Sequence, residues 1–442
     1  MTPRDRHFRD PVHDYISFRG SSRTDRLLLS LVATCEVQRL RRIRQLGLAN
    51  LVFPGAEHSR FPHGIGVMQV AREMLDALCR TDRRLRRHEP ALLAAALLHD
   101  VGHGPLSHAF EPISGRRHER WSSAIVLDEG TEVNRALRRF DRDLPGAVND
   151  LFLGRYRAAP LLGDLVSSQL DADRLDYLQR DVLATGVRHG RFDLRRILLF
   201  LLPGDGRVLV DGRALAAVEG YVIARAHMYE HVYYHKTVRA AESMLRAAVL
   251  RARDLGAVEG LPAGLRATLQ GRRPALGDYL AIDDGDFLAA LRAWSGSRDR
   301  GLASLAGGLL DRRLLKCVEI PDPLAFKARR YAAVKERARA LVRRRGFNPD
   351  ADLVLDESAE ERYLPYVAGA GRGKAILVHE RGRSAPLPLE VASDLVRRLS
   401  ERRVYLVRWF CPAPLREPLQ RLVASAAAGP RGRPVARRPA TR

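Results

Sequence analysis

The organisation of this chain is read most directly from residues 97–108, LLHDVGHGPLSH. Apolar residues before and into this stretch predict a helix over about 90–98, which the glycines at 102 and 104 then end. The helix therefore finishes by presenting His99 and Asp100 side by side. An imidazole nitrogen next to a carboxylate suits a mid-row divalent metal with mixed nitrogen and oxygen ligands better than a thiolate zinc site.

Two more histidines, His103 and His108, follow within the same stretch. A capped helix followed by a polar loop would account for an isolated His-Asp pair. Three histidines and an aspartate in such a short segment, set among two glycines and a proline, favour a functional site instead.

The composition indicates a large globular protein. The chain has 442 residues, 46% of them hydrophobic, and is expected to form one large domain and a smaller one. Its 4 cysteines lie far apart without a CxxC pair, which argues for a reducing compartment and against a disulfide framework. The N-terminus is charged, and the longest apolar run, 91–98, is too short to span a bilayer. We expect a cytoplasmic protein that is not bound to a membrane.

The formal net charge of +23 is carried almost entirely by arginine. Such a balance predicts attraction to polyanions, whether nucleotides, nucleic acid or acidic surfaces, and does not choose among them. A GC-rich genome that encodes arginine in place of lysine would produce the same composition.

The apolar pattern predicts a mainly α-helical protein in four parts. A strand or hairpin segment occupies 1–25, a helical domain 26–315, an α+β lobe 316–428 and a disordered basic tail 429–442. Helical spacing covers 25–46, 63–79, 117–128, 131–140, 144–153, 160–183, 214–255 and 284–291 in the large domain, with a short hairpin at 207–210. In the lobe we expect helices over 331–345 and 389–402 and strands over 353–355, 375–378 and 403–409.

A metal bound by His99 and Asp100 needs further ligands from elsewhere in the chain. The best candidates are His63, at the start of the preceding helix, and Asp173 in the segment 169–177, QLDADRLDY. Two histidines and two aspartates leave room for water in an octahedral shell, as a hydrolytic site requires.

The helix that carries Asp173 predicts further groups at the same cavity. Asp173, Tyr177 and Arg180 share one helical face by their spacing, so the ligand, a phenol and a guanidinium would point the same way. The alternative is that the three aspartates of this segment, at 171, 173 and 176, are solvated surface charges.

The order of these residues is similar to that of the HD superfamily of metal-dependent phosphohydrolases. The sequence around these residues resembles more closely that of the deoxynucleoside triphosphate triphosphohydrolases of that superfamily. The resemblance rests on residues 38–47, QRLRRIRQLG, on 52–56, VFPGA, on 59–63, SRFPH, on 97–108 and on 171–181. It covers about 8–250 strongly and the C-terminal lobe weakly, and no stretch resembles the sterile-alpha-motif domain of some family members.

The resemblance implies four metal ligands, His63, His99, Asp100 and Asp173. It implies an α-phosphate contact for Arg60, and Arg174 stands where relatives carry a lysine near the same phosphate, which keeps the charge and changes its geometry.

The same resemblance implies active-site roles for His103, His108 and His118, with His108 as general acid to the leaving sugar oxygen. Glu111 replaces the supporting aspartate of the family. The expected substrate contacts are Gln45, Leu46, Tyr177, Asp181 and Tyr233 around the sugar and base, and Arg225 at the γ-phosphate.

These roles predict hydrolysis of deoxynucleoside triphosphates to deoxynucleoside and inorganic triphosphate, by attack of water at the α-phosphorus. The cofactor would be a divalent metal, with Fe, Mn, Mg, Ni, Co and Zn all open, and the resemblance implies a homodimer or homotetramer. One alternative is an HD phosphohydrolase for guanosine tetraphosphate, a nucleoside monophosphate or a cyclic nucleotide. Another is a protein that binds nucleic acid through its basic surface and tail and retains a vestigial site.

The resemblance also bears on regulation. Family members activated by guanine nucleotide read the base through an aspartate just before the Gln-Arg-Leu-Arg text, where this chain has Ala33, and Arg9 replaces an asparagine that precedes an Asp-Pro pair. Gln38 and Arg41 remain and could hold a phosphate or simply pack on the first helix. We therefore expect no obligatory guanine nucleotide activator. A deoxynucleotide at a neighbouring site, with Lys236 as a phosphate contact, stays open.

Overall fold

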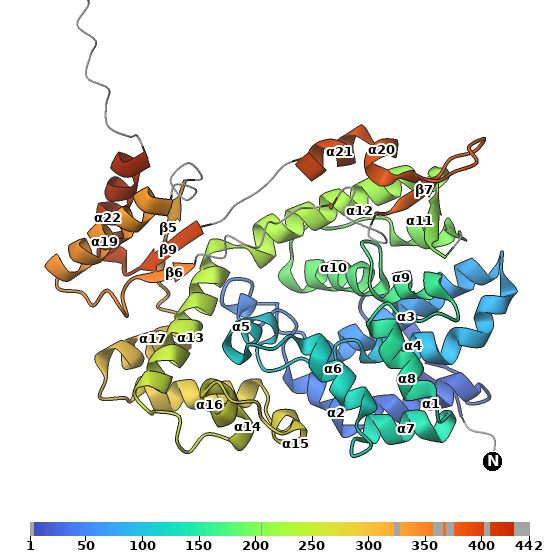
Figure 1. Cartoon of the computed structure of the whole chain (residues 1–442), viewed down its shortest axis with the longest axis horizontal. Helices are drawn as coiled ribbons and strands as arrows, with labels where there is room; N and C mark the ends of the chain where they lie inside the picture. The colour runs from blue at the N-terminus through green and yellow to red at the C-terminus, as the bar shows by residue number, and fades with distance from the viewer. Residues whose placement is uncertain are drawn as a thin grey trace, which may run out of the picture.

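The computed structural model describes residues 4–204, 206–321, 328–356, 366–367, 375–401 and 407–427. The predicted tail, 429–442, and the first part of the predicted strand 403–409 lie outside the described residues. The protein is mainly α-helical, which confirms the predicted fold class (Figure 1).

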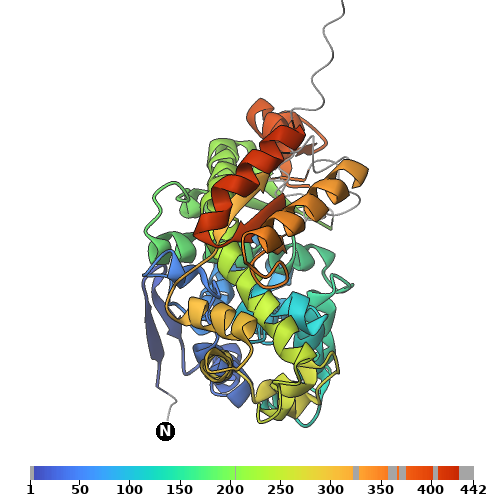
Figure 2. The same ribbon diagram turned by 90° about the vertical axis from the view of Figure 1, so that its left-hand side faces the viewer.

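The N-terminal segment forms the expected hairpin. Strands β1 (Arg6–Asp10) and β2 (Asp14–Phe18) pair antiparallel in a register that runs from Arg6 opposite Phe18 to Asp10 opposite Asp14. The ribbon lies along one edge of the helical body (Figure 2). Ile16 and Phe18 are fully buried, so β2 is fixed by the main hydrophobic core rather than by the hairpin alone.

The helical body is built from two successive groups of helices. The first comprises α1 (Arg23–Val32), α2 (Cys35–Arg39), α3 (Arg60–Cys79), α4 (Glu89–Leu98), α5 (Glu111–Ser114), α6 (His118–Leu127), α7 (Glu132–Phe140), α8 (Leu144–Phe152), α9 (Gly163–Val166), α10 (Ala172–Thr185) and α11 (Leu194–Leu199). The second comprises α12 (Leu215–Met228), α13 (Lys236–Asp254), α14 (Ala263–Leu269), α15 (Leu276–Leu280), α16 (Asp284–Ser295) and α17 (Arg300–Leu310).

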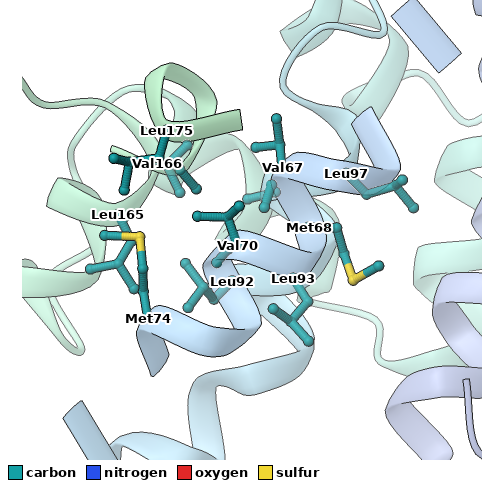
Figure 3. Close-up of a cluster of buried hydrophobic side chains, with 14 of the residues drawn as sticks. Val67, Met68, Val70, Met74, Leu92, Leu93, Leu97, Leu165, Val166 and Leu175 are labelled. Carbon is teal, nitrogen blue, oxygen red and sulfur yellow. The ribbon is translucent and has the colours of Figure 1, made fainter. Parts of the chain in front are cut away.

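The main core lies where α3 and α4 pack against α9 and α10. Helix α4 is apolar on every side, and all its residues from Ala91 to Leu98 are buried, as expected of a helix at the centre of a domain. Figure 3 shows side chains of these helices interlocking, with Val70 and Met74 of α3 beside Leu92 of α4 and Leu165 of α9. This packing fixes the ends of α3, α4 and α10, which carry the predicted metal ligands.

Four predicted helices are interrupted. The helix expected over 160–183 divides into a 3-10 turn, α9 and α10, and the helix expected over 389–402 divides at Ser393. The helix expected over 25–46 divides into α1, α2 and a short 3-10 turn, because the Thr34 hydroxyl caps a new helix by accepting from the backbone N–H of Val37. The helix expected over 214–255 divides into α12 and α13 around a π-helical turn, Tyr229–Tyr233. The His235 ring then caps α13 at the N–H of Thr237. Helical periodicity continues across these last two interruptions, so the sequence pattern does not show them.

The elements of the predicted α+β lobe form parts of two separate sheets. Strands β5 (Lys316–Ile320), β6 (Val354–Asp356) and β9 (Val407–Cys411) form an antiparallel sheet in the order β5-β9-β6. Helices α19 (Ala328–Arg344) and α22 (Ala413–Ala427) pack on this sheet. Helix α13 runs from the helical body to this lobe (Figure 1).

The second sheet belongs to the helical body. It is ordered β3-β4-β7-β8, from β3 (Leu201–Pro203), β4 (Val208–Asp211), β7 (Leu377–His379) and β8 (Leu387–Pro388). The predicted hairpin at 207–210 is the pair β3–β4, and β7 joins it in parallel. Helices α20 (Leu389–Ala392) and α21 (Asp394–Glu401) follow β8, and Ser393 between them bonds Glu219 of α12. No described helix is long and apolar enough to cross a bilayer.

Candidate metal centre and nucleotide cavity

Three helix ends bring the predicted metal ligands together. His63 lies in the first turn of α3, and His99 is the residue at which α4 ends. Asp173 lies in the first turn of α10, which begins where it does because the Asp171 carboxylate accepts from the backbone N–H of Arg174 at 2.8 Å.

The four expected ligands face one another. Nε2 of His63 lies 3.1 Å from Oδ1 of Asp173 and 3.5 Å from Oδ2 of Asp100. Nε2 of His99 lies 3.3 Å from Oδ1 of Asp100 and 3.5 Å from Oδ1 of Asp173. Two imidazoles and two carboxylates therefore converge on one small volume.

The ring nitrogens are oriented as metal ligands. Nδ1 of His63 lies 2.8 Å from Oδ2 of Asp176, and Nδ1 of His99 lies 2.8 Å from the carbonyl oxygen of Ala96. Both partners are acceptors, so both Nδ1 atoms carry hydrogen and the Nε2 lone pairs remain available. Both Nε2 atoms are buried without a hydrogen-bond partner among the described residues. The donor set thus fits a divalent cation.

The electrostatics of the centre favour a bound cation. Burial alone would lower the pKa of His63, but the nearby carboxylates of Asp173 and Asp176 outweigh it and raise that pKa to about 10. Burial would raise the pKa of Asp173, yet its contacts with His63 and His99 bring it well below the usual range. The carboxylates that stabilise a proton here would stabilise a metal cation in the same way.

Asp176 is a buried residue at this centre for which the sequence predicted no role and left a solvated surface charge as the alternative. Besides the His63 ring, it bonds Nε2 of His13 at 2.6 Å and Nε and Nη2 of Arg180 at 2.9 Å each. Arg180 in turn donates from Nη1 to Oδ2 of Asp10 at 2.9 Å, which ties the hairpin to α10. A spacing of three residues after Asp173 was the only signal for Asp176 in the sequence.

Arg180 was predicted to face the cavity with Asp173 and Tyr177, and this prediction is wrong. Seven residues place Arg180 about 10 Å along the helix from Asp173. There the carboxylate of Asp176, one turn back, binds its guanidinium inside the protein. The α3 helix approaches closely at this point because it carries Gly66, where a Cβ atom would lie 2.0 Å from Oδ1 of Asp176.

The remaining histidines form a second cluster beside Asp100. The rings of His103 and His118 stack with centroids 3.7 Å apart, and Nε2 of His103 lies 3.3 Å from Oδ1 of Asp100. Burial, with the charges of Arg60 and His118, places the pKa of His103 well below its usual value, so this ring is neutral. The ring of His108 lies at the open side of the cluster, with its centroid 4.9 Å from that of His103.

Glu111 serves both outer histidines. Its Oε1 accepts from the backbone N–H of His118 at 3.1 Å and lies 2.5 Å from Nδ1 of the same ring. Its Oε2 lies 3.7 Å from Nδ1 of His108. Although burial would raise it, the pKa of Glu111 falls well below its usual range through these two rings. Glu111 is therefore an ionised carboxylate that lies against both outer rings.

Arg60 is held beside Asp100 by a turn whose backbone is strained. Leu106 and Ser107 both have a φ of 56°, in the left-handed region that residues with a Cβ rarely adopt. This turn sets the Ser107 hydroxyl 2.7 Å from Nε of Arg60, while Nη1 of Arg60 bonds Asp100. The guanidinium therefore lies between a proposed metal ligand and the cavity.

The cavity above the metal centre has a volume of about 1540 Å³. Arg60, Asp100 and Asp173 line its floor. The other expected contacts also line it, namely Gln45, Leu46, His103, His108, Glu111, His118, Arg174, Tyr177, Asp181, Arg225 and Tyr233.

One wall of the cavity is aromatic and rigid. The Tyr177 ring lies edge-on to the His63 ring, with centroids 6.5 Å apart, and 6.1 Å from the Tyr233 ring. The Tyr233 hydroxyl donates to Oδ2 of Asp181 at 2.7 Å, and Nε2 of His58 lies 2.8 Å from Oδ1 of the same carboxylate. Asp181 thus fixes this wall next to the metal centre.

Comparison with known proteins agrees with this geometry. A family model described as the HD domain matches residues 60–181, and one described as an HD associated region matches 192–344. The YwfO protein of Bacillus subtilis is 38% identical over 365 residues, which cover 81% of this chain and 80% of that protein. The chain belongs to the HD-domain family. The matched HD domain starts at Arg60, ends at Asp181 and contains all four proposed ligands.

More distant relatives of this HD protein include proteins whose names state an enzymatic activity. The deoxynucleoside triphosphate triphosphohydrolase SAMHD1 of Danio rerio is 25% identical over 464 residues, with 91% of this chain and 73% of the relative covered. A phosphohydrolase of Bacteroides thetaiotaomicron with a solved structure superposes with a TM-score of 0.75 at 28% identity, over 92% of this chain and 99% of that one. This protein is an HD-domain phosphohydrolase.

Proposed function

We propose that this phosphohydrolase cleaves deoxynucleoside triphosphates into a deoxynucleoside and inorganic triphosphate. One observation carries the proposal: a single cavity is lined by two of the proposed ligands, Asp100 and Asp173, by a set of arginines and by the aromatic wall of Tyr177 and Tyr233. A polyanionic chain and a deoxysugar would each find a matching surface there. The similarity to SAMHD1 of Danio rerio adds support for this substrate class.

Three of the arginines would bind the triphosphate. Arg60, Arg174 and Arg225 all line the cavity, and the guanidinium carbon of Arg225 lies 5.4 Å from the centroid of the Tyr229 ring, which braces it. Nε of Arg174 lies 3.2 Å from Oδ2 of Asp171, which aims the side chain along the first turn of α10. Planar guanidinium groups fixed in this way bind phosphate oxygens with little loss of side-chain freedom.

His63, His99, Asp100 and Asp173 would hold the divalent metal, which supplies Lewis-acid polarisation of a phosphoryl oxygen and lowers the pKa of a bound water. The bonds of Arg60 and His103 with Asp100 keep that carboxylate ionised and oriented. In the reaction, the oxygen of water forms a bond to the α-phosphorus and the bond between that phosphorus and the 5′-oxygen breaks.

His108 is suited to protonate the departing 5′-oxygen. Its exposed ring lines the cavity, and the Glu111 carboxylate lies 3.7 Å from its Nδ1, which orients the ring as a general acid would need. His103 is buried and neutral, so it orients Asp100 rather than supplying the proton. Arg60 absorbs negative charge that gathers on the phosphoryl oxygens.

The test is hydrolysis of a nucleotide panel by the purified protein with Mn²⁺, Co²⁺ or Mg²⁺. The panel contains the four deoxynucleoside triphosphates, their ribose counterparts, guanosine tetraphosphate, a monophosphate and a cyclic nucleotide. We expect release of deoxynucleoside and triphosphate, lost in His99→Ala and Asp173→Ala and retained in His7→Ala, an exposed histidine of β1. Turnover of only another nucleotide class would favour the alternative phosphohydrolase activity.

The proposal extends to the assembly and the location of the enzyme, a cytoplasmic homodimer or homotetramer. Light scattering of the purified protein measures the first. Nucleic acid binding through the basic surface is a competing use of the charge, and a mobility shift with single-stranded nucleic acid at increasing salt measures it.

A further inference from the structure

Three histidines outside the cavity lie close together at the surface. The ring centroids of His189 and His227 are 5.8 Å apart, those of His227 and His231 are 5.9 Å apart, and those of His189 and His231 are 6.3 Å apart. His189 and His231 are exposed and His227 is half-buried. The proposed hydrolysis uses none of these three side chains.

Two of the histidines share one face of a helix. His227 lies in the last turn of α12 and His231 four residues later, in the π-helical turn that continues it. Their rings are nearly parallel, at 11°. Two histidines one turn apart on a helix are a recurring arrangement for binding a transition metal.

The third histidine comes from a segment whose backbone is fixed against α12. Gly190, next to His189, is buried so tightly that a Cβ atom there would lie 2.7 Å from both Cγ and Sδ of Met228. The following Phe192 packs edge-on against Tyr221 of α12, with centroids 5.3 Å apart. The backbone of the third histidine is therefore placed beside His227 before any ligand binds.

We propose that His189, His227 and His231 form a second metal site, for a late first-row divalent ion such as Zn²⁺ or Ni²⁺. A set of imidazoles selects these ions over Mg²⁺ and Ca²⁺, which prefer oxygen ligands. Imidazoles that share a tetrahedral zinc ion have ring centroids about 5 Å apart, so the rings need to approach by about 1 Å. The stacked rings of His227 and His231 also need to turn until their nitrogens face one point. Rotation of the side chains supplies that movement. A water molecule would take the fourth ligand position of the tetrahedral ion.

Such an ion would tie together two helices that line the cavity. The segment that carries His189 follows α10, the helix of Asp173 and Tyr177, while α12 carries Arg225. None of the three histidines lines the cavity. The ion would hold the end of α10 to α12, and its binding would stabilise the folded state by mass action. The second site is thus a structural tie and not a catalytic centre.

Zinc stoichiometry tests the proposal without measuring catalysis. The metal-free protein is dialysed against buffered Zn²⁺ and the bound metal is counted for four forms. We expect His227→Ala/His231→Ala to bind one ion fewer than the natural protein, and the matched control His7→Ala/His379→Ala to bind the same number. His63→Ala/His99→Ala should retain the ion of the second site. Equal zinc binding by His227→Ala/His231→Ala and its control would overturn the proposal.

Limited proteolysis supplies an independent measurement. Arg188 and Arg191 are exposed and flank His189, so trypsin can cut on both sides of it. At a Zn²⁺ concentration of about ten times the dissociation constant, cleavage there should slow by about tenfold in the natural protein and the control. It should not change in His227→Ala/His231→Ala. Equal slowing in both variants would mean that zinc acts elsewhere and would contradict the site.

Discussion

Nδ1 of His63 lies 2.8 Å from Oδ2 of Asp176, and this bond sets the direction of the whole ring. Because Nδ1 donates to the carboxylate, Nε2 is left as a lone pair aimed at Asp173 and Asp100. Asp176 would therefore act on the proposed metal centre through His63, without being a ligand itself.

Asp176→Asn should weaken the affinity for the divalent metal by about 10–100-fold, because the amide no longer fixes the tautomer and the orientation of the His63 ring. Calorimetric titration of the metal-free variant with Mn²⁺ measures this. Asp193→Asn, which makes the same change at the cap of α11, is the matched control and should bind as the natural protein does. Unchanged affinity in Asp176→Asn would show that the His63–Asp176 bond has no influence on the centre.

Arg180→Met should destabilise the protein by about 3–5 kcal/mol, because it leaves the carboxylates of Asp10 and Asp176 buried without their cation. Arg180→Lys should lose less. Thermal unfolding followed by circular dichroism measures the difference. The exposed pair of Arg84 and Asp82 offers the comparison, since Arg84→Met should leave Tm nearly unchanged. Similar Tm values for Arg180→Met and Arg84→Met would refute the structural role.

The natural enzyme should prefer dATP to ATP, because in the proposed mode of binding the Tyr177 ring, beside the His63 ring, takes the space that a 2′-hydroxyl would need. Excluding a hydroxyl group by shape alone usually changes the ratio of kcat/KM values by on the order of a hundredfold. Tyr177→Ala should bring the ratio of kcat/KM for the two nucleotides toward one, whereas Tyr15→Ala, on the exposed hairpin, should not alter it. A ratio that Tyr177→Ala leaves unchanged would assign sugar selection to another residue.

Hydrolysis of a single non-guanine deoxynucleotide with metal alone should not require GTP. Ala33, at the end of α1, has no acceptor for the guanine edge. Nε2 of Gln38 donates to the carbonyl of Val32 at 2.7 Å, and the Arg41 guanidinium carbon lies 3.6 Å from the centroid of the Phe61 ring, so both side chains have structural partners. Turnover that appears only after GTP is added, at concentrations too low to alter free metal, would contradict this expectation.

The centre was predictable where its residues are close in sequence or lie in a distinctive text. His99 and Asp100 follow from one helix end, His63 and Asp173 were the best further candidates, and the resemblance implies the same four ligands. Asp176 was missed because its meaning depends on partners far away in sequence, His13 among them. No local pattern distinguishes a buried aspartate that holds a ligand from one that is solvated.

The fold class was predictable from helical periodicity, while the interruptions were not. A π-helical turn at 229–233 keeps nearly the same apolar spacing as an α-helix, yet it determines where Tyr229 and Tyr233 lie along the cavity. The parallel pairing of β7 with β4 joins strands 168 residues apart at Leu209 and Leu377, which short-range patterns do not contain.

The reaction itself is tested most directly by hydrolysis of dATP in water enriched in ¹⁸O. The products are separated and their masses are measured by mass spectrometry. Attack at the α-phosphorus with loss of the 5′-oxygen predicts unlabelled deoxyadenosine and triphosphate that carries one ¹⁸O atom. Formation of deoxyadenosine monophosphate with pyrophosphate, or of the diphosphate with phosphate, would contradict the proposed reaction.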